Sequence, residues 1–171
     1  GVKGVKFMQM TVVLPYAVPG VIIALSMILA FSQPIAGVRL YNTIWILLIA
    51  YIARFMNLGY NNISGAISQV DTSLEEAARI SGASQLRAFK DVMLPLLKSS
   101  LISSFFLVVA PTISELSLSS LLWSVGNETI GTIVFSAKEE GRILLTAAIA
   151  IILIILVVVI NLLVNSQTDK D

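Results

Sequence analysis

The chain has no cysteine and no histidine among its 171 residues. The first absence excludes disulfides, thiolate nucleophiles and thiolate metal ligands. The second removes the commonest general base and the commonest transition-metal ligand. Charge is also scarce, because charged residues make up only 12% of the chain, about half the share usual in a globular domain. With a net charge of +1, the sequence gives no reason to expect nucleic acid as a partner, and it lacks a plausible set of catalytic residues.

Apolar residues, by contrast, make up 57% of the sequence, and the mean hydropathy is +0.92. A soluble domain of this length has too little interior to bury so much apolar surface. We therefore expect an all-α integral membrane protein in a lipid bilayer. Each spanning helix needs about 20 largely apolar residues, and the apolar runs predict about four, near residues 10–31, 42–58, 96–114 and 143–164. The chain begins with Gly1 rather than methionine and has no signal-peptide pattern, so we expect it to be part of a longer protein.

Prolines and one arginine interrupt these predicted helices. Pro15 and Pro19 lie in the first half of the first helix and predict a bent or broken entry. Pro111 predicts a bend in the third helix. Arg54, near one end of the second, has two interpretations: its side chain extends to the membrane surface, or it is buried beside a partner. We favour the first, because a buried unpaired charge is costly.

The basic residues predict the orientation, because cytoplasmic segments of membrane proteins carry an excess of lysine and arginine. Four spans place both termini on one side, together with the polar segment 71–100. Eight basic residues fall on that side: Lys3, Lys6, Arg54, Arg79, Arg87, Lys90, Lys98 and Lys170. Three fall on the other: Arg39, Lys138 and Arg142. We therefore expect both termini to be cytoplasmic, with a short turn near Ser32–Leu40 and a longer loop near Trp123–Arg142 on the opposite side.

The polar segment 71–100 reads DTSLEEAARISGASQLRAFKDVMLPLLKSS and stands between long apolar runs. Its charges predict contact with water, and with a partner in that water. Gly82 can end a first short helix in the left-handed conformation. Two pairs have capping-box spacing and predict where that helix begins: Thr72 with Glu75, and Ser73 with Glu76.

A second short helix, Gln85–Met93, follows in this segment. Ser84 can cap its start, and Pro95 discourages its continuation. Leu86 and Phe89 lie three residues apart, so they project together as an apolar wedge. The wedge suits a groove in a partner protein, but it equally suits an amphipathic helix resting on lipid headgroups. Two basic residues flank it: Arg87 and Lys90.

The spacing within this segment resembles the EAA loop of binding-protein-dependent ABC importer permeases. The signature E-A-A-x3-G-x9-I-x-L-P is matched by Glu76, Ala77, Ala78, Gly82, Val92, Leu94 and Pro95, with valine in the isoleucine position. We call residues 71–95 the EAA loop. Three further stretches resemble the ferric-iron branch of this family: LPYAVPGVIIAL (14–25), ISELSLSSLL (113–122) and ETIGTIVF (128–135).

This resemblance implies a fold, a function and partners. The chain would be the last four spans of a six-span type I permease unit, in the bacterial inner membrane. The EAA loop would be a coupling element that sits in a cleft of a cytoplasmic ATP-binding subunit dimer. The implied partners include a second permease subunit or fused half and an extracytoplasmic solute-binding protein. The residues that we expect to shape the docking element are Glu76, Ala77, Ala78 and Gly82, and those that we expect from face geometry to touch the ATPase are Leu86, Arg87, Phe89 and Lys90. Leu94 and Pro95 complete the ATPase-coupling loop.

The chain has no glycine-rich phosphate loop, so we expect no ATP hydrolysis, no cofactor and no resident metal. The cargo implied by the resemblance is ferric iron or another small ion or solute. Two rival functions remain: a secondary transporter or channel without an ATPase partner, whose sign would be inverted repeats, and a membrane-embedded enzyme. Outer-side carboxylates could pair with a docking protein, although an ordinary solvated surface is the simpler interpretation: Glu128, Glu139 and Glu140.

Glu115 is an isolated carboxylate between apolar runs. One interpretation places it on the translocation path, where it would attract a cation such as ferric iron. The other places it near the outer membrane surface, bonded to Ser117, Ser119 or a neighbouring helix. We favour the second, because one carboxylate alone is a poor iron site.

Overall fold

The structure is a computed structural model that describes residues 2–168. Lys170, one of the residues used to predict orientation, lies outside the described residues, as do the side chains of Val2, Lys3, Val5, Lys6, Thr72 and 164–168. The elements run in the order α1 (Val2–Ala17), α2 (Gly20–Phe31), α3 (Ile44–Gln69), α4 (Thr72–Ile80), α5 (Gln85–Ala88), the π-helical turn η1 (Phe89–Met93), α6 (Leu94–Leu96), α7 (Lys98–Ile113), α8 (Ser119–Leu122), α9 (Ile130–Glu139) and α10 (Ile143–Thr168). Within 2–168 there is no β-strand, which confirms the predicted all-α class.

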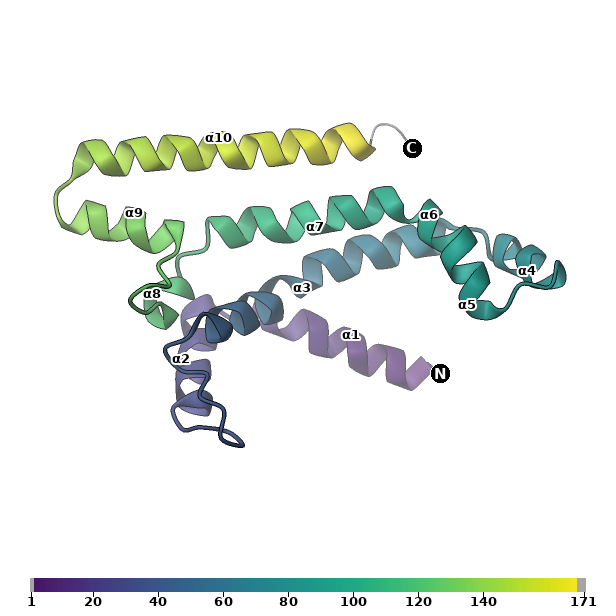
Figure 1. Ribbon diagram of the computed structural model, residues 1–171, viewed down its shortest axis with the longest axis horizontal. Helices are drawn as coiled ribbons and strands as arrows, with labels where there is room; N and C mark the ends of the chain where they lie inside the picture. The colour runs from purple at the N-terminus through teal and green to yellow at the C-terminus, as the bar shows by residue number, and fades with distance from the viewer. Residues whose placement is uncertain (1, 169–171) are drawn as a thin grey trace.

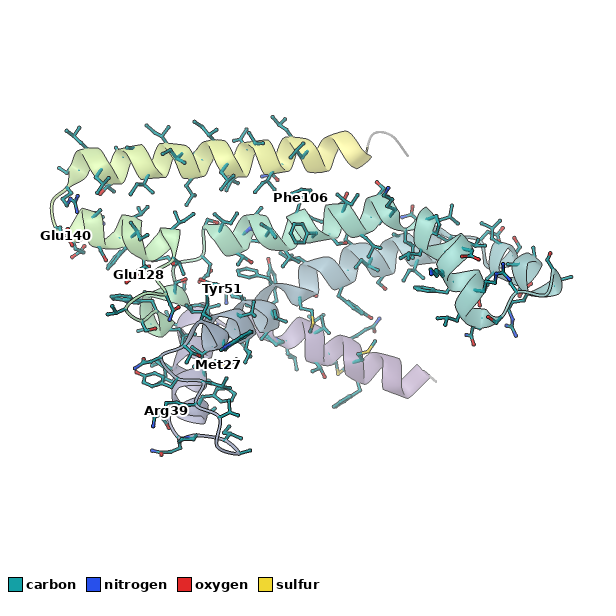
Figure 2. All side chains as sticks on the ribbon, viewed as in Figure 1. Met27, Arg39, Tyr51, Phe106, Glu128 and Glu140 are labelled. Atoms are coloured by element: carbon teal, nitrogen blue, oxygen red, sulfur yellow. The ribbon has the colours of Figure 1, made fainter. Side chains whose placement is uncertain are left out.

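The long helices lie roughly side by side, and the EAA loop extends from one end of the bundle (Figure 1). The start of α1 and the end of α10 lie toward this same end. Arg39, Glu128 and Glu140 lie toward the opposite end (Figure 2). There the predicted short turn is closed by two hydrogen bonds between the backbones of Ile35 and Val38, at 3.1 and 2.9 Å.

The first predicted span, residues 10–31, is not one helix. It is two, α1 and α2, whose axes differ by 109°. The break falls at Val18–Pro19, where the proline has extended backbone (φ −55°, ψ 137°). Proline disfavours helical geometry at the residue before it and cannot donate a backbone hydrogen bond. Pro15, by contrast, lies inside α1, so only the second proline breaks the segment.

The other spans agree more closely with expectation. The α3 helix is longer than predicted, at 26 residues, whereas α7 and α10 begin and end close to the predicted bounds. Two helices of the described chain are long and apolar enough to cross a membrane, and up to four if each bent pair forms one span. The α10 helix is almost wholly aliphatic, and only 6% of its most apolar 18-residue stretch is buried inside the structure, as expected for a helix that faces lipid.

Close helix packing at the centre depends on small residues. The α3 and α7 helices run side by side (Figure 1), and a Cβ atom on Gly59 would lie 3.2 Å from Cγ2 of Val108. Small residues at such contacts let two backbones approach closely within a membrane. A separate apolar core joins α2, α3 and α8: Ile23, Ala24, Ile46, Leu47, Ala50, Leu118 and Leu122.

The loop predicted near Trp123–Arg142 contains a helix, α9. Its start has a capping box: Thr132 N donates to Thr129 Oγ1 at 3.3 Å, and Thr129 N donates to Thr132 Oγ1 at 2.9 Å. The prediction of a loop without a helix was wrong here. The apolar stretch 130–137 is short, and the charged residues that follow it are typical of a loop. Gly141, with φ 71°, then makes the tight turn into α10.

Candidate functional site: the EAA loop and the Arg54–Glu115 pair

The first helix of the EAA loop, α4, has its N-cap one residue before the earlier of the two predicted capping boxes. Asp71 is the N-cap of α4, and its Oδ1 accepts a hydrogen bond of 2.9 Å from Ser73 N. The hydrogen bond from that backbone N–H, and then one from the Ser73 hydroxyl, lower the pKa of Asp71. Aspartate is a strong N-cap because its carboxylate accepts from an otherwise unpaired amide and favours the helix dipole. The predicted caps at Thr72 and Ser73 were therefore one and two residues too late.

Gly82 ends α4 as predicted, with φ +90°. Gly82 N donates to Arg79 O and Ala83 N donates to Ala78 O, both at 3.0 Å, which is the Schellman arrangement. Ser84 then caps α5, as predicted, through a 3.4 Å hydrogen bond from Arg87 N. The loop is therefore a helix, a glycine turn and a second helix.

The second helix does not stop before Pro95. It continues without a break from Gln85 to Leu96 and bends by 66° only where α7 begins. Leu94 N donates to Phe89 O, five residues earlier, so the backbone widens into a π turn. A proline ring clashes with the carbonyl four residues before it, here that of Asp91, and the wide turn contains this residue. The π turn thus accommodates Pro95, and the predicted stop at Met93 was wrong.

The loop presents apolar side chains to its surroundings. Leu86 is 77% exposed, Phe89 49% and Ile80 87%. The first two are the predicted wedge. The prediction missed Ile80, a large aliphatic residue between the polar residues Arg79 and Ser81. Exposed apolar residues grouped on a small element are typical of a contact surface. The other loop residues predicted as coupling residues are exposed or half-buried: Glu76, Ala77, Ala78, Gly82, Arg87, Lys90, Leu94 and Pro95.

A hollow of about 590 Å³ lies between α4 and α5. Glu76, Arg79 and Ile80 line one side, and Ala83 lies at the turn. The hollow places an acidic, a basic and an aliphatic group within one recess. Nearby, Arg87 Nε pairs with Asp91 Oδ2 at 3.3 Å, but both side chains are more than half exposed, so this pair adds little stability.

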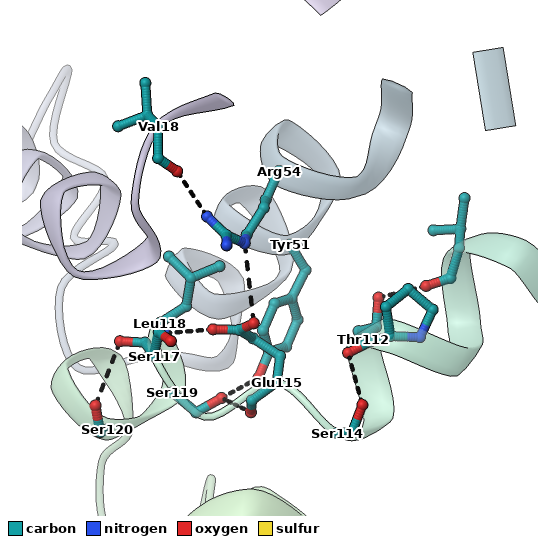
Figure 3. Close-up of polar contacts among 12 residues, drawn as sticks. Val18, Tyr51, Arg54, Thr112, Ser114, Glu115, Ser117, Leu118, Ser119 and Ser120 are labelled. Atoms are coloured by element: carbon teal, nitrogen blue, oxygen red, sulfur yellow. Dashed lines mark hydrogen bonds and ion pairs between the residues drawn. The ribbon is translucent and has the colours of Figure 1, made fainter. Parts of the chain in front are cut away.

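The second polar feature is an ion pair inside the helical bundle. Arg54 Nε lies 3.8 Å from Glu115 Oε2, and the two side chains are only 20% and 11% exposed (Figure 3). Arg54 Nη1 donates to Val18 O at 2.8 Å, at the break between α1 and α2. Leu118 N donates to Glu115 Oε1 at 2.8 Å. The pair therefore joins the broken first segment, the middle of α3 and the turn that leads into α8.

Neighbouring groups fix Glu115 from several directions. Ser119 Oγ donates to Glu115 O at 2.9 Å and is also hydrogen-bonded to the hydroxyl of Tyr51. A Cβ atom on Gly131 would lie 2.9 Å from Glu115 O, and one on Gly20 would lie 3.3 Å from Glu115 Oε1. Gly20 therefore lets a backbone approach the carboxylate of Glu115, and Gly131 lets one approach its backbone carbonyl, so a larger side chain at either would force these segments apart.

The structure corrects one interpretation of these charges. The Arg54 side chain is not an exposed helix-end group: it lies well inside α3, is only 20% exposed and pairs with Glu115. For Glu115, the expected bond to a neighbouring helix is present as the ion pair with Arg54 of α3, but its carboxylate accepts from Leu118 N rather than from the hydroxyl of Ser117 or Ser119. Its place near the outer membrane surface stays a prediction. A role on the translocation path remains a prediction. Among the described residues, no three acidic side chains gather as a metal site would require.

The opposite end carries its own ion pair and caps. Glu128 Oε1 accepts from Gly126 N at 3.0 Å, and this hydrogen bond lowers the pKa of Glu128. Glu140 Oε2 lies 3.5 Å from Arg142 Nη1. These contacts are local and exposed, which is typical of a solvated surface.

The fold and the EAA loop define a polytopic α-helical membrane component with a helical loop at one end. Comparison with known families makes this definition specific: the model of the family "Binding-protein-dependent transport system inner membrane component" matches residues 2–169. The chain belongs to this family, whose members are permease components of ABC transport systems.

The curated relatives of this chain are named for different transported solutes. The putative 2-aminoethylphosphonate transport system permease protein PhnV of Salmonella typhimurium is 30% identical over 152 residues, which cover 89% of this chain and 57% of the relative. The putrescine permease PotI of Escherichia coli is 28% identical, covering 82% and 50%. The Fe(3+)-transport permease FbpB 2 of Haemophilus influenzae is 27% identical, covering 75% and 26%. The chain thus spans a little over half the length of the first of these relatives, half of the second and about a quarter of the third.

Two solved structures share the fold. A bacterial ABC transporter that imports the acidic polysaccharide alginate has a TM-score of 0.75 at 19% identity, covering 96% of this chain and 65% of the other. The alginate transporter in complex with a periplasmic protein bound to an alginate pentasaccharide gives 0.74 at 21%, covering 98% and 66%. At these identities, the likeness describes the fold alone.

Proposed function

We propose that the chain is the membrane-spanning permease subunit of an ATP-driven solute importer. In this role it receives solute from an extracytoplasmic binding protein and passes it through the membrane with a second permease subunit or fused half. ATP is hydrolysed by a separate cytoplasmic subunit. The observation that carries the proposal is the EAA loop, with its signature spacing, its capped helix–turn–helix and its exposed apolar groups at one end of the bundle.

The loop supports a mechanical role. An element that transmits motion has to be stiff and has to connect to a core with alternative arrangements. The N-caps Asp71 and Ser84 and the Schellman turn at Gly82 stiffen the loop. Its second helix continues through η1 and α6 to within one residue of α7. Displacement of α5 by a partner would therefore be transmitted to α7, and through the α3–α7 contact to the bundle. This connection favours an ATPase-coupled importer over a channel.

The identity of the cargo is a finer proposal. Ferric iron remains our prediction from the three segments at residues 14–25, 113–122 and 128–135. The relatives bear the names of 2-aminoethylphosphonate, putrescine and ferric iron, so all three belong in one uptake panel. Choice among them belongs mainly to the solute-binding protein.

The coupling role is tested by Gly82→Asp in the assembled transporter. The new side chain would block close approach of a partner at the glycine turn, so we expect assembly in the membrane but loss of substrate-stimulated ATP hydrolysis and of uptake. Gly126→Asp is the matched control, because Gly126 has φ +87° and open space around it, as Gly82 has at +90°, but it lies at the opposite end. The control should retain both activities. Normal stimulated hydrolysis and uptake in Gly82→Asp would contradict the proposal.

A further inference from the structure

A polar cleft of about 410 Å³ lies between α3 and α7, at the end of the bundle that carries the EAA loop. Small-molecule sites usually have volumes of about 300–1,000 Å³, so the cleft is large enough for a small solute. The 26 residues of α3 make a helix of about 39 Å, longer than the roughly 30 Å hydrocarbon core. The last turns of α3 form one wall and lead directly into the EAA loop, the end at which we expect water to enter.

The cleft is lined by amides and hydroxyls. Asn61, Asn62 and Gln69 come from α3, and Ser100 and Ser103 from α7. None of the side chains that the structure places in this lining is charged. Polar residues within membrane-spanning helices are costly, and they usually face a cavity that carries solute or water.

Hydrogen bonds within the bundle hold the amides of the cleft in place. Asn62 Nδ2 donates to Ser100 O at 3.1 Å and to Ser104 Oγ at 2.9 Å. Asn61 Nδ2 donates to Asn57 Oδ1 at 3.0 Å. Each bond fixes the amide through its nitrogen, and no described residue donates to the carbonyl oxygens Oδ1 of Asn61 and Asn62, so these oxygens are the groups that we expect to accept from a guest. Ser103, 6% exposed, contributes a hydroxyl from the α7 wall.

We propose that this cleft is a low-affinity exit site for the transported solute, a small polar molecule held by amides and hydroxyls without an ion pair. The inference rests on the proposed import function and adds the residues that the solute meets last. An uncharged wall has no strong Coulomb attraction to trap an ion of either sign. Weak binding at this position favours release, because transport requires that a solute leave as readily as it enters.

Gly65 supplies the sharpest test, since it lines the cleft and a Cβ atom there would meet nothing within 4 Å. Gly65→Leu should therefore fill the cleft without disturbing the protein, and leucine also favours helix more than glycine does. Gly4→Leu is the matched control: Gly4 is also a helical glycine with open space, but in α1. In the assembled transporter, uptake of 2-aminoethylphosphonate, putrescine and ferric citrate is measured together with ATP hydrolysis.

We expect Gly65→Leu to lower uptake of the imported compound about tenfold or more, equivalent to about 1.4 kcal/mol, with ATP hydrolysis retained. Gly4→Leu should transport like the unmodified protein. Unchanged uptake in Gly65→Leu would overturn the exit site and leave the permease proposal intact. Loss of ATP hydrolysis in Gly65→Leu would also overturn it, because the cleft would then serve coupling.

The lack of cysteine allows a second, cargo-independent readout. Gly65→Cys in inside-out vesicles should react with cationic and anionic methanethiosulfonate reagents at rates within about threefold, because no charged lining concentrates either one. A residue closed to both reagents would overturn the inference. So would a disulfide between two copies of the chain at this position, because the cleft would then be an interface between subunits.

Discussion

Loss of the Glu115 charge should destabilise the protein more than loss of any surface charge. At 3.8 Å and an effective dielectric constant of 20, the attraction between Arg54 and Glu115 is about 4 kcal/mol before desolvation is counted. Both side chains are mostly buried, and removal of one partner from a buried pair costs about 3–5 kcal/mol, since the other charge is left uncompensated. Glu115→Gln keeps an acceptor for Leu118 N but leaves Arg54 with only Val18 O.

We therefore expect Glu115→Gln to lower the free energy of unfolding by about 3 kcal/mol, which corresponds to a fall of roughly 6–12 °C in Tm for a domain of this size. The assay is thermal unfolding of the purified protein in detergent. Arg54→Met combined with Glu115→Gln removes both charges and should recover about 1–2 kcal/mol relative to Glu115→Gln alone. The matched control is Glu140→Gln, which removes the exposed partner of Arg142 and should change stability by less than about 1 kcal/mol.

If Glu115→Gln and Glu140→Gln had the same small effect, the pair would not hold the bundle together and the reasoning would be refuted. Uptake by the same variant is a separate measurement: transport that survives in proportion to folded protein would remove Glu115 from the translocation path.

Three further outcomes follow from single contacts. Because its pKa is lowered in the folded state, Asp71 should stabilise α4 above the carboxyl's ordinary titration range, and amide exchange in α4 should accelerate as the pH falls through the lowered pKa; Asp71→Asn, which caps without titrating, should remove this pH dependence. Gly131→Ala places a Cβ atom against the carbonyl of Glu115 and should cost about 1–3 kcal/mol, whereas Gly65→Ala, into open space, should not lower Tm. Thr129→Ala removes the N-cap of α9 and should cost about 0.5–2 kcal/mol, with Thr129→Ser restoring most of it.

Local chemistry made much of the EAA loop predictable. The glycine turn at Gly82 and the cap at Ser84 depend on residues close in sequence, and both predictions are confirmed. The continuation through Pro95 was not predictable in this way, because it depends on a π turn that residue preferences do not specify. The break in the first segment depends on which of two prolines has extended backbone, and residue preferences alone do not distinguish Pro15 from Pro19.

The Arg54–Glu115 pair shows what sequence patterns omit. Hydrophobic periodicity predicts where each helix lies but not which helices are neighbours, so two charges in distant segments were interpreted singly. A signal was present, since a basic and an acidic residue each interrupted an apolar run, and buried charges usually occur in pairs. The glycines that close around the pair, Gly20 and Gly131, carried no such signal.

Contact between the EAA loop and an ATP-binding subunit is the central claim, and site-specific photocrosslinking in the assembled transporter tests it most directly. The crosslinker replaces Leu86, which is 77% exposed on α5, and in a control protein Leu144, which is 89% exposed on α10. Leu86 should capture the ATP-binding subunit, and the yield should change when ATP closes that subunit. Leu144 should not capture it. Capture of lipid alone at Leu86, or equal capture at both positions, would contradict the account.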